Sequence, residues 1–377
     1  DHPRRLADHN TTLAELFEQS GYATGGFLTH AYLRPKWNYL QGLEVYNGFD
    51  RSQLGVRALT RRPAGSAGAQ VARALEWVGG VEDRPFFLWF QTQLTHYFPR
   101  IKPPFVAEDD LRAARELQEL VKDSSNAHRM FAFDSLGADA ELVQGYLAAY
   151  DGAVSRSDHL LGRLLGGLEE LGRLKNTVIV VTADHGEALG EKGLFATHDS
   201  NLLEPTIRSP FILRLPGAQP GEIQAVTRNI DLLPTLAEVV GLTLPAEVQG
   251  QSLVPLLRGE PLELPAFTET RPMVASRGTF ERYRVRVPGV PGKLRSIRRG
   301  DFKLTLFPTP DGVEVELYDV VRDPDESRDL KNEMPQLTRE MYRELAEWFA
   351  AYDVADTAPL DLEDEDLESL RALGYID

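Results

Sequence analysis

The feature that most constrains the fold is a long helical pattern that leads directly into a short, wholly apolar strand. Between residues 142 and 172, apolar side chains recur at steps of three and four, which predicts an amphipathic helix. Residues 177–183 (TVIVVTA) follow, and such a run is typical of a strand that is covered on both faces. The recurring positions are Leu147, Val154, Leu161, Leu164, Leu165, Leu168 and Leu171.

Helical and strand patterns alternate along the first 260 residues. This alternation favours an α/β fold with a mainly parallel sheet sandwiched between helices. Residues 100–140 are charged and irregular, and we expect a surface insertion there. Besides the pair above, helices are predicted at 10–20, 66–79, 108–122 and 230–241, and strands at 22–29, 85–91 and 210–217.

The pattern changes near residue 262, where short alternating runs replace the continuous apolar ones. These runs, YRVRV, FKLTLF and VEVELYDV, predict a small antiparallel sheet, and a helix is predicted after them at 335–351. We therefore expect three parts. They are an α/β domain at 1–261, a small C-terminal α+β subdomain at 262–352 and an acidic tail at 353–377.

Charge and composition exclude several kinds of partner. The formal net charge is −16, so the surface repels nucleic acid and anionic membranes. No run approaches the ~20 apolar residues that a membrane span needs. The 377 residues contain no cysteine, which excludes a disulfide, a thiolate metal site and a cysteine nucleophile within them. An anionic substrate would need a cation or local basic residues to reverse the repulsive field.

Ionisable residues follow three of the predicted strands. His30 comes after the strand at 22–29, His96 after the strand at 85–91, and Asp184 with His185 after the strand at 177–183. In open parallel sheets, ligands bind beyond the carboxyl ends of the strands, so a shared site is expected there. For His30 a structural role is the favoured interpretation, whereas His96 is favoured as a site residue.

Asp184 and His185 place a carboxylate oxygen next to an imidazole nitrogen. This pair suits a divalent cation, and Gly186 would relieve crowding where the chain turns after the strand. The alternative is that Asp184 caps a following helix and His185 packs against the core. The neighbouring ionisable residues favour the metal interpretation.

Lys192 and His198 follow in a loop that contains several glycines. Together they could supply positive charge and a proton near an anionic leaving group. For Lys192 a solvated loop lysine is an equal alternative. For His198 a role in the site is the favoured interpretation.

Segments along nearly the whole chain resemble the sulfatase family within the alkaline-phosphatase-like superfamily. The most specific part is 142–257, which includes YLAAYDGAVSRSDHLLGRLLGGLEELGRLKNTVIVVTADHGEALGE. The other matching segments, in order, are TTLAELFEQSGYATGGFLT, GLEVYNGFD, RPFFLWFQTQLTHYFPR, SPFILRLPG, NIDLLPTLAEVVGL, GQSLVPLLRG, FKLTLF and ELYDVVRDPDESRDL. The resemblance implies an alkaline-phosphatase-like fold.

The resemblance also implies metal-dependent hydrolysis of sulfate esters. Asp184 and His185 match metal ligands of the family, for which Ca²⁺ is expected and Mg²⁺, Mn²⁺ and Zn²⁺ are alternatives. His96 matches a histidine that contacts the ester group, and His198 matches a residue that contacts the sulfate and the leaving oxygen. Lys192 stands where relatives often have a histidine. The implied substrate is a small anionic ester or a sulfated glycan, and the implied location is the periplasm or the cell exterior.

The family's nucleophile motif, Cys or Ser followed by x-Pro-x-Arg, does not occur in the sequence. The upstream Asp-Asp pair that completes the family's metal site is not found either. The sequence opens DHPRRLADHN, without a methionine and without the apolar core of a signal peptide. We therefore expect that the chain begins partway through a larger protein and is inactive alone.

Two alternatives remain open. Relatives with the same fold cleave phosphate monoesters or diesters, or transfer phosphoethanolamine, with a Ser or Thr nucleophile. The D-H-G-E turn occurs across these groups and does not distinguish them. The other alternative is a non-catalytic, sulfatase-like binding module.

Overall fold

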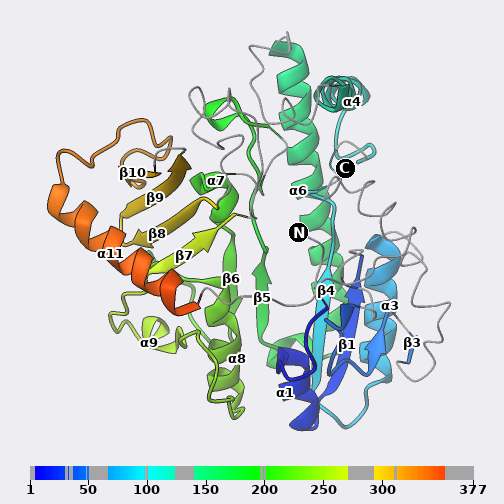
Figure 1. The fold of residues 1–377 in the computed structure, drawn as a ribbon. Coiled ribbons are helices and arrows are strands. Elements are labelled where there is room, and N and C mark those ends of the chain that lie inside the picture. The colour runs from blue at the N-terminus through cyan, green and yellow to red at the C-terminus, as the bar shows by residue number, and fades with distance from the viewer. Residues whose placement is uncertain are drawn as a thin grey trace.

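The structure is a computed structural model. It describes residues 5–29, 33, 37–47, 49–50, 67–96, 98, 101–123, 140–195, 198, 201–270, 293–309 and 312–352. Figure 1 shows two regions of strand on either side of the molecule, with the long helix α6 (Ala140–Glu170) behind the gap between β4 and β5. Among the described residues, every helix is too short or too polar to span a lipid bilayer.

The first sheet has the order β3-β2-β1-β4 and is mainly parallel. Its central strand β1 pairs in parallel with both neighbours, whereas the short β2 and β3 are antiparallel to each other. All six residues of β1 are buried, as the sequence ATGGFL predicts for a strand covered on both faces. The strands are β1 (Ala23–Leu28), β2 (Val45–Tyr46), β3 (Phe49–Asp50) and β4 (Phe86–Gln91).

Three helices confirm the sequence-based predictions for this part. Helix α1 (Leu13–Gln19) begins at Thr12, whose side chain forms a reciprocal capping box with Glu15. Helix α3 (Ala67–Gly80) packs against the C-terminal half of α6 through an apolar cluster. Helix α6 has 31 residues and is about 46 Å long, so it extends along both halves of the domain.

Helix α4 (Glu108–Asp123) corrects the expectation of a surface insertion. Leu111, Ala114 and Leu117 are almost fully buried against the N-terminal half of α6. The helix is amphipathic, because its acidic residues face solvent while this stripe faces α6. The charged composition concealed the buried face of this helix. Helix 108–122 itself was placed correctly.

The second pair of strands follows α6 and is antiparallel. The 3₁₀ turn η5 (Leu174–Asn176) leads into strand β5 (Ile179–Thr182). Strand β5 pairs with β6 (Phe211–Arg214). Within the described residues β5 has no pairing with β4. The predicted helix at 230–241 consists of a 3₁₀ turn η7 (Asn229–Asp231) and α8 (Leu232–Val240). Short turns of helix, η6 (Glu191–Gly193), α7 (Glu204–Ile207) and α9 (Val254–Leu257), complete this part.

The C-terminal sheet is antiparallel throughout, with the order β10-β9-β8-β7. Helix α11 (Pro335–Tyr352) covers one of its faces, where Ile297, Leu304 and Leu317 pack against Met341 and Leu345. The strands are β7 (Ala266–Glu269), β8 (Arg295–Arg299), β9 (Phe302–Thr309) and β10 (Gly312–Asp319).

The predicted fold class, α/β with a small C-terminal α+β subdomain, is confirmed. FKLTLF and VEVELYDV form β9 and β10, but β7 and β8 had not been predicted. The run YRVRV and the predicted tail at 353–377 lie outside the described residues. The division at residues 261 and 262 stays a prediction.

Candidate active site

The segments that follow β4 and β5 meet beyond the carboxyl ends of these two strands. The ring of His185 lies 4.0 Å from that of His198, measured between centroids, and the two rings are nearly parallel. The ring of His96 lies 5.2 Å from His198 and 6.5 Å from His185. The structure therefore brings together three predicted site residues, one from the segment after β4 and two from the loop after β5. Their catalytic and metal-binding roles stay predictions, and His30 lies outside the described residues.

The turn at Gly186 fixes the position of Asp184 and His185. The backbone N–H of Gly186 donates to the carbonyl of Thr206 at 2.9 Å, and that of Glu187 donates to the carbonyl of Pro205 at 3.1 Å. A Cβ atom at position 186 would lie only 1.9 Å from the Pro205 carbonyl oxygen. Only glycine therefore allows the turn to approach α7 so closely.

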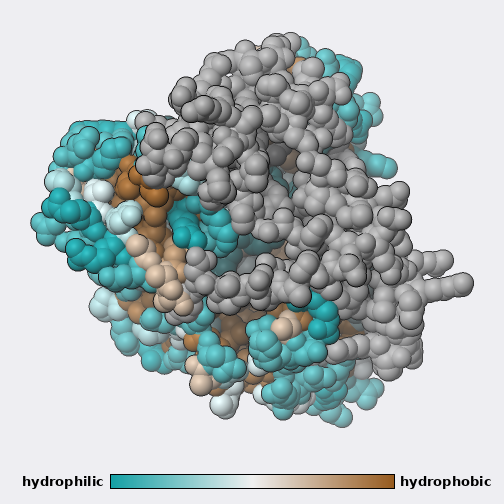
Figure 2. Space-filling model, viewed as in Figure 1, coloured by the Kyte–Doolittle hydropathy of each residue, from teal (hydrophilic) through white to brown (hydrophobic). Residues whose placement is uncertain are grey.

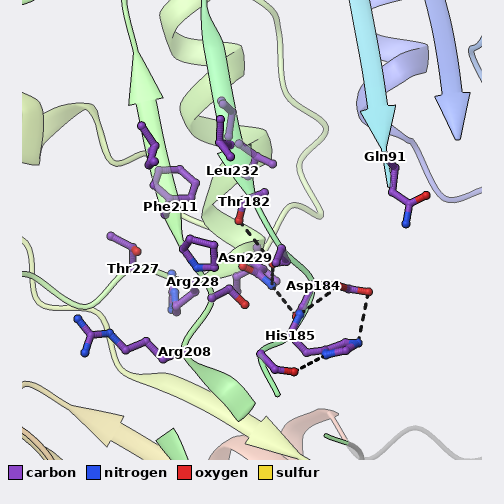
Figure 3. A pocket seen from close by; sticks show the side chains of 18 of the residues that line it. Gln91, Thr182, Asp184, His185, Arg208, Phe211, Thr227, Arg228, Asn229 and Leu232 are labelled. Atoms are coloured by element: carbon purple, nitrogen blue, oxygen red, sulfur yellow. Dashed lines mark hydrogen bonds and ion pairs between the residues drawn. The ribbon is translucent and has the colours of Figure 1, made fainter. Parts of the chain in front are cut away.

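Asp184 and His185 offer two donor atoms to the same space. The Nδ1 atom of His185 lies 2.7 Å from the carbonyl oxygen of Gly186, an acceptor, so Nδ1 carries a hydrogen and Nε2 is the nitrogen left for a cation. That Nε2 lies 3.9 Å from Oδ2 of Asp184, whose side chain is 87% exposed (Figure 3). Asn229 supports the turn, because its amide donates to the backbone carbonyl of Asp184 at 3.2 Å.

The donor pair suits a divalent cation in kind, but it is incomplete. One carboxylate and one imidazole nitrogen at this separation can share an ion with bonds of about 2.1–2.5 Å. Among the described residues, no group of three or more His, Asp or Glu side chains is arranged to hold a metal. Asp184 and His185 would therefore supply only part of a coordination shell.

Glu187 lies inside the site, although the sequence had given no reason to single it out. Its side chain is nearly buried, and its Oε2 accepts a hydrogen bond from Nδ1 of His198 at 3.1 Å. Its Oε1 has no hydrogen-bond partner within the part of the chain that the structure describes. Glu187 belongs to the D-H-G-E motif, but its partner is eleven residues further along, and only the loop conformation brings the two together. Asn229 was missed for the same reason.

One histidine and two tyrosines of the site have shifted pKa values that favour their neutral forms. Burial lowers the pKa of His96 below its ordinary value, and the neighbouring His198 lowers it further. Burial raises the pKa of Tyr146 and of Tyr150, and the carboxylate of Glu187 adds to both shifts. These shifts favour the neutral imidazole of His96 and the neutral phenols of Tyr146 and Tyr150 in this part of the site.

Lys192 points toward the C-terminal sheet. Its backbone is left-handed, with φ at 50°, and its Nζ lies 5.0 Å from the centre of the Tyr318 ring on β10. This is a cation–π geometry. The position shows how a residue of the site loop contacts the C-terminal sheet, and a catalytic role for Lys192 stays a prediction.

A cavity of about 3010 Å³ opens between β4 and β5 and reaches the histidines. Leu161 and Leu165 of α6 line it, together with both strands. Figure 3 shows Gln91, at the end of β4, on one side and Thr182 and Asp184 on the other. The wall includes Ile212, which is 61% exposed, and Figure 2 shows apolar surface at the lower centre, over the region of β6 and α8.

Comparison with known proteins decides the family. The model of the sulfatase family matches residues 2–242, which is more than half of the chain. The chain belongs to the sulfatase family. A second family model, the C-terminal part of N-sulphoglucosamine sulphohydrolase, matches residues 190–351 of this sulfatase-family chain. That match includes both the His198 loop and the C-terminal sheet.

Two relatives show how much of a longer protein this sulfatase-family chain covers. It is 34% identical over 209 residues to N-acetylglucosamine-6-O-sulfatase of Bacteroides thetaiotaomicron, a match that covers 54% of the chain and 36% of the relative. It is 23% identical over 314 residues to arylsulfatase K of Xenopus laevis, covering 78% of the chain and 56% of the relative. The chain thus spans only about a third to just over half of these relatives.

Solved structures share the fold. One, described as a complex with its substrate D-glucosamine-2-N,6-O-disulfate, has a TM-score of 0.64 and 23% identity over 94% of the chain and 84% of that structure. A phosphonate monoester hydrolase from Silicibacter pomeroyi has a TM-score of 0.63 and 19% identity, over 93% and 82%. These likenesses confirm the alkaline-phosphatase-like fold of this sulfatase-family chain.

Proposed function

We propose that this chain forms the metal-binding and leaving-group side of a site that hydrolyses sulfate esters in the intact protein. The main support is that the Asp184–His185 donor pair lies next to His96 and His198 at the ends of β4 and β5. A divalent cation, with Ca²⁺ as the proposed ion, would act there as a Lewis acid and offset the charge of an anionic ester. A net charge of −16 makes such an offset necessary.

We propose separate roles in metal binding, hydrogen bonding and proton transfer for the residues of this chain. Asp184 and His185 would hold the cation with Oδ2 and Nε2. His96, whose lowered pKa favours the neutral ring, could donate a hydrogen bond to an ester oxygen without adding charge. His198 would give a proton to the leaving oxygen as the ester bond breaks. Lys192 is proposed as a further source of positive charge at the loop.

The proposed substrate class is a sulfated sugar or another small sulfate ester. Support comes from the name of one relative, an N-acetylglucosamine-6-O-sulfatase, and from a solved neighbour described with a disulfated glucosamine. The alternative is a phosphate or phosphonate ester, and phosphonate monoester hydrolases among the neighbours keep it open. We also propose that the intact protein acts in the periplasm or outside the cell, which cell fractionation would test.

We further propose that the nucleophile and the remaining metal ligands lie on a segment outside the sequence presented here. Support comes from β4 and β5, whose facing edges have no pairing among the described residues and enclose the cavity. A strand edge inside a domain is normally paired, because its N–H and C=O groups need partners. We expect the 377-residue chain alone to be inactive.

The test compares sulfate with phosphate in the longest natural polypeptide that contains this chain, supplied with Ca²⁺. Turnover of 6-O-sulfated N-acetylglucosamine or 4-nitrophenyl sulfate, and little of 4-nitrophenyl phosphate, is the expected result. Asp184→Ala should abolish most of this turnover, whereas Asp109→Ala, at an exposed position of α4, should not. Preference for phosphate would establish the alternative ester. Absence of all turnover would favour the non-catalytic module.

A further inference from the structure

Glu187 has features that packing alone does not explain. Its side chain is 9% exposed, and only Oε2 has a hydrogen-bond partner among the described residues, the Nδ1 atom of His198. A buried carboxylate costs free energy unless an opposite charge pairs with it, as Arg298 and Lys303 do with the buried Glu204. The described partner of Glu187, in contrast, is a histidine of the site. The placement of this carboxylate therefore calls for a functional reason.

The backbone holds Glu187 in a fixed place. Its N–H donates to the carbonyl of Pro205, and the neighbouring Gly186 donates to the carbonyl of Thr206. The two hydrogen bonds attach the start of the loop to the segment around α7. Since the carboxylate extends from this anchored backbone, it can act as a fixed acceptor for a less constrained ring.

The hydrogen bond determines which nitrogen of His198 carries the hydrogen. An ionised carboxylate is an acceptor only, so Nδ1 of His198 must donate to it. The other nitrogen, Nε2, lies on the side of the ring away from Glu187. In this tautomer it carries a lone pair, so it must first take up a proton from solvent, as an imidazolium paired with Glu187, before it can give that proton to the leaving oxygen. The same hydrogen bond fixes the plane of the ring, which stacks on His185 at 4.0 Å and 11°.

We propose that Glu187 is a positioning residue that fixes the tautomer and the ring plane of His198, so that Nε2 is the nitrogen presented to the substrate. The proposal deepens the function proposed above and rests on it for the role of His198. It assigns Glu187 no contact with the substrate. Glu187 also links the leaving-group residue to the proposed metal ligands, because His198, which Glu187 orients, stacks on His185.

The first test reads the tautomer directly and does not depend on activity. In the 377-residue chain labelled with ¹⁵N in its histidine rings, the two nitrogen shifts of His198, assigned with His198→Gln, should report a hydrogen on Nδ1. Glu187→Ala should shift His198 toward the Nε2–H tautomer or a mixture. An unchanged Nδ1–H tautomer in Glu187→Ala would overturn the proposal, whatever the enzyme does.

The second test uses turnover by the intact protein with its cation bound. Glu187→Ala should lower kcat about 10- to 100-fold with KM little changed, which is the usual range for a residue that orients another. In a His198→Ala background the same change should cost less than about threefold, since its target is gone. A full additional loss in that background would mean a structural role and would contradict the proposal.

Two further variants provide controls. Glu191 lies in the same loop, and its carboxylate accepts from the backbone N–H of Leu189 at 2.7 Å. Any loss in Glu191→Ala should persist in the His198→Ala background.

If Glu187→Ala does not fold, Glu187→Gln provides the test of the proposal. It should either keep the Nδ1–H tautomer with near wild-type turnover or reverse the tautomer and lose turnover. Reversal with unchanged turnover would overturn the proposal.

Discussion

Two clusters of charged side chains lie close to α7, and they are built in opposite ways. In the first, defined by Lys303, Glu326 and Glu204, all three side chains are almost fully buried. The Nζ of Lys303 donates to Glu326 at 2.6 Å and to the carbonyl of Leu202 at 2.7 Å, and it lies 3.6 Å from Glu204. In the second, the histidine site, Asp184 is exposed and the described partner of the Glu187 carboxylate is the ring of His198.

The difference separates a structural role from a chemical one. In the Lys303 cluster, opposite charges face each other: Nζ of Lys303 lies at hydrogen-bond distance from Glu326 and 3.6 Å from Glu204. Arg298 adds a further pairing to Glu204, and the backbone N–H of Glu204 donates to Glu326. In the histidine site, the carboxylate oxygens of Asp184 face open space. Exposed donor atoms in a cavity are typical of residues that bind a cation or a substrate. Charge alone does not identify a site: buried charges that pair with one another are structural, whereas the exposed carboxylate of Asp184 beside an imidazole is open to a ligand.

The largest expected effect comes from removing the positive charge of the buried cluster. Lys303→Met should lower the free energy of unfolding by about 3–5 kcal/mol, because Glu326 is left buried without its partner. Chemical denaturation of the chain measures this loss. Lys331→Met is the matched control, since that lysine pairs with Asp329 at a partly exposed position and should cost about 1 kcal/mol or less. Equal losses in the two variants would contradict the comparison.

The next effect concerns turnover and not stability. His198→Ala should reduce kcat of the intact protein about 10²- to 10³-fold, because proton transfer to the leaving oxygen is lost. The free energy of unfolding should change much less than in Lys303→Met. His159→Ala, on the exposed face of α6, serves as the control and should retain activity. A His198→Ala protein that turns over sulfate ester normally would remove this residue from the chemistry.

A smaller effect is expected on cation binding by the chain itself. With two donors from Asp184 and His185, titration calorimetry should show weak Ca²⁺ binding, with a Kd on the order of 10⁻³ M. Asp184→Asn should weaken it at least about tenfold, whereas Asp109→Asn on α4 should leave it unchanged. Tight binding that survives Asp184→Asn would place the cation elsewhere.

The smallest effect is a dependence of stability on pH. Folding lowers the pKa of His96 below the ordinary histidine value of about 6.5, so the folded protein binds fewer protons than the unfolded one. Stability should therefore fall as the pH drops through about 6.5 toward the folded pKa, and it should be unaffected above that range. His96→Gln should show a smaller loss of melting temperature between about pH 7.5 and pH 5.5 than the wild type. His159→Gln should keep the wild-type loss.

The sequence predicted those parts of the fold that periodicity and continuous apolar runs determine. Helix α6 and strand β5 were placed within a few residues, and the rule that ligands gather at carboxyl strand ends located His96, Asp184 and His185. Strand β8 was missed because its sequence, RSIRR, carries three arginines and shows little apolar pattern. Its pairing partners, not its own composition, make it a strand.

Side-chain direction in the site could not be predicted. The orientation of Lys192 depends on a left-handed backbone at that residue, and the pairing of Glu187 with His198 depends on how the intervening loop turns. Lys303 is a similar case. In the alternating run FKLTLF a lysine indicates the solvent side of a strand, yet residues around Leu202 cover that side and bury it. Lys192 and Lys303 contact segments distant in sequence, and the contact of Glu187 with His198 depends on a loop, so local sequence patterns predict none of the three.

The Lys303 cluster has a consequence for how members of such a family can exchange parts. Glu204 belongs to the segment just beyond His198, while Lys303 and Glu326 belong to the C-terminal sheet and the turn after it. A chimaera joined near residue 262 would inherit one half of this buried ion cluster from each parent. Such hybrids should tolerate the junction only when both parents carry compatible charges at these three positions, so this C-terminal part is no freely interchangeable module.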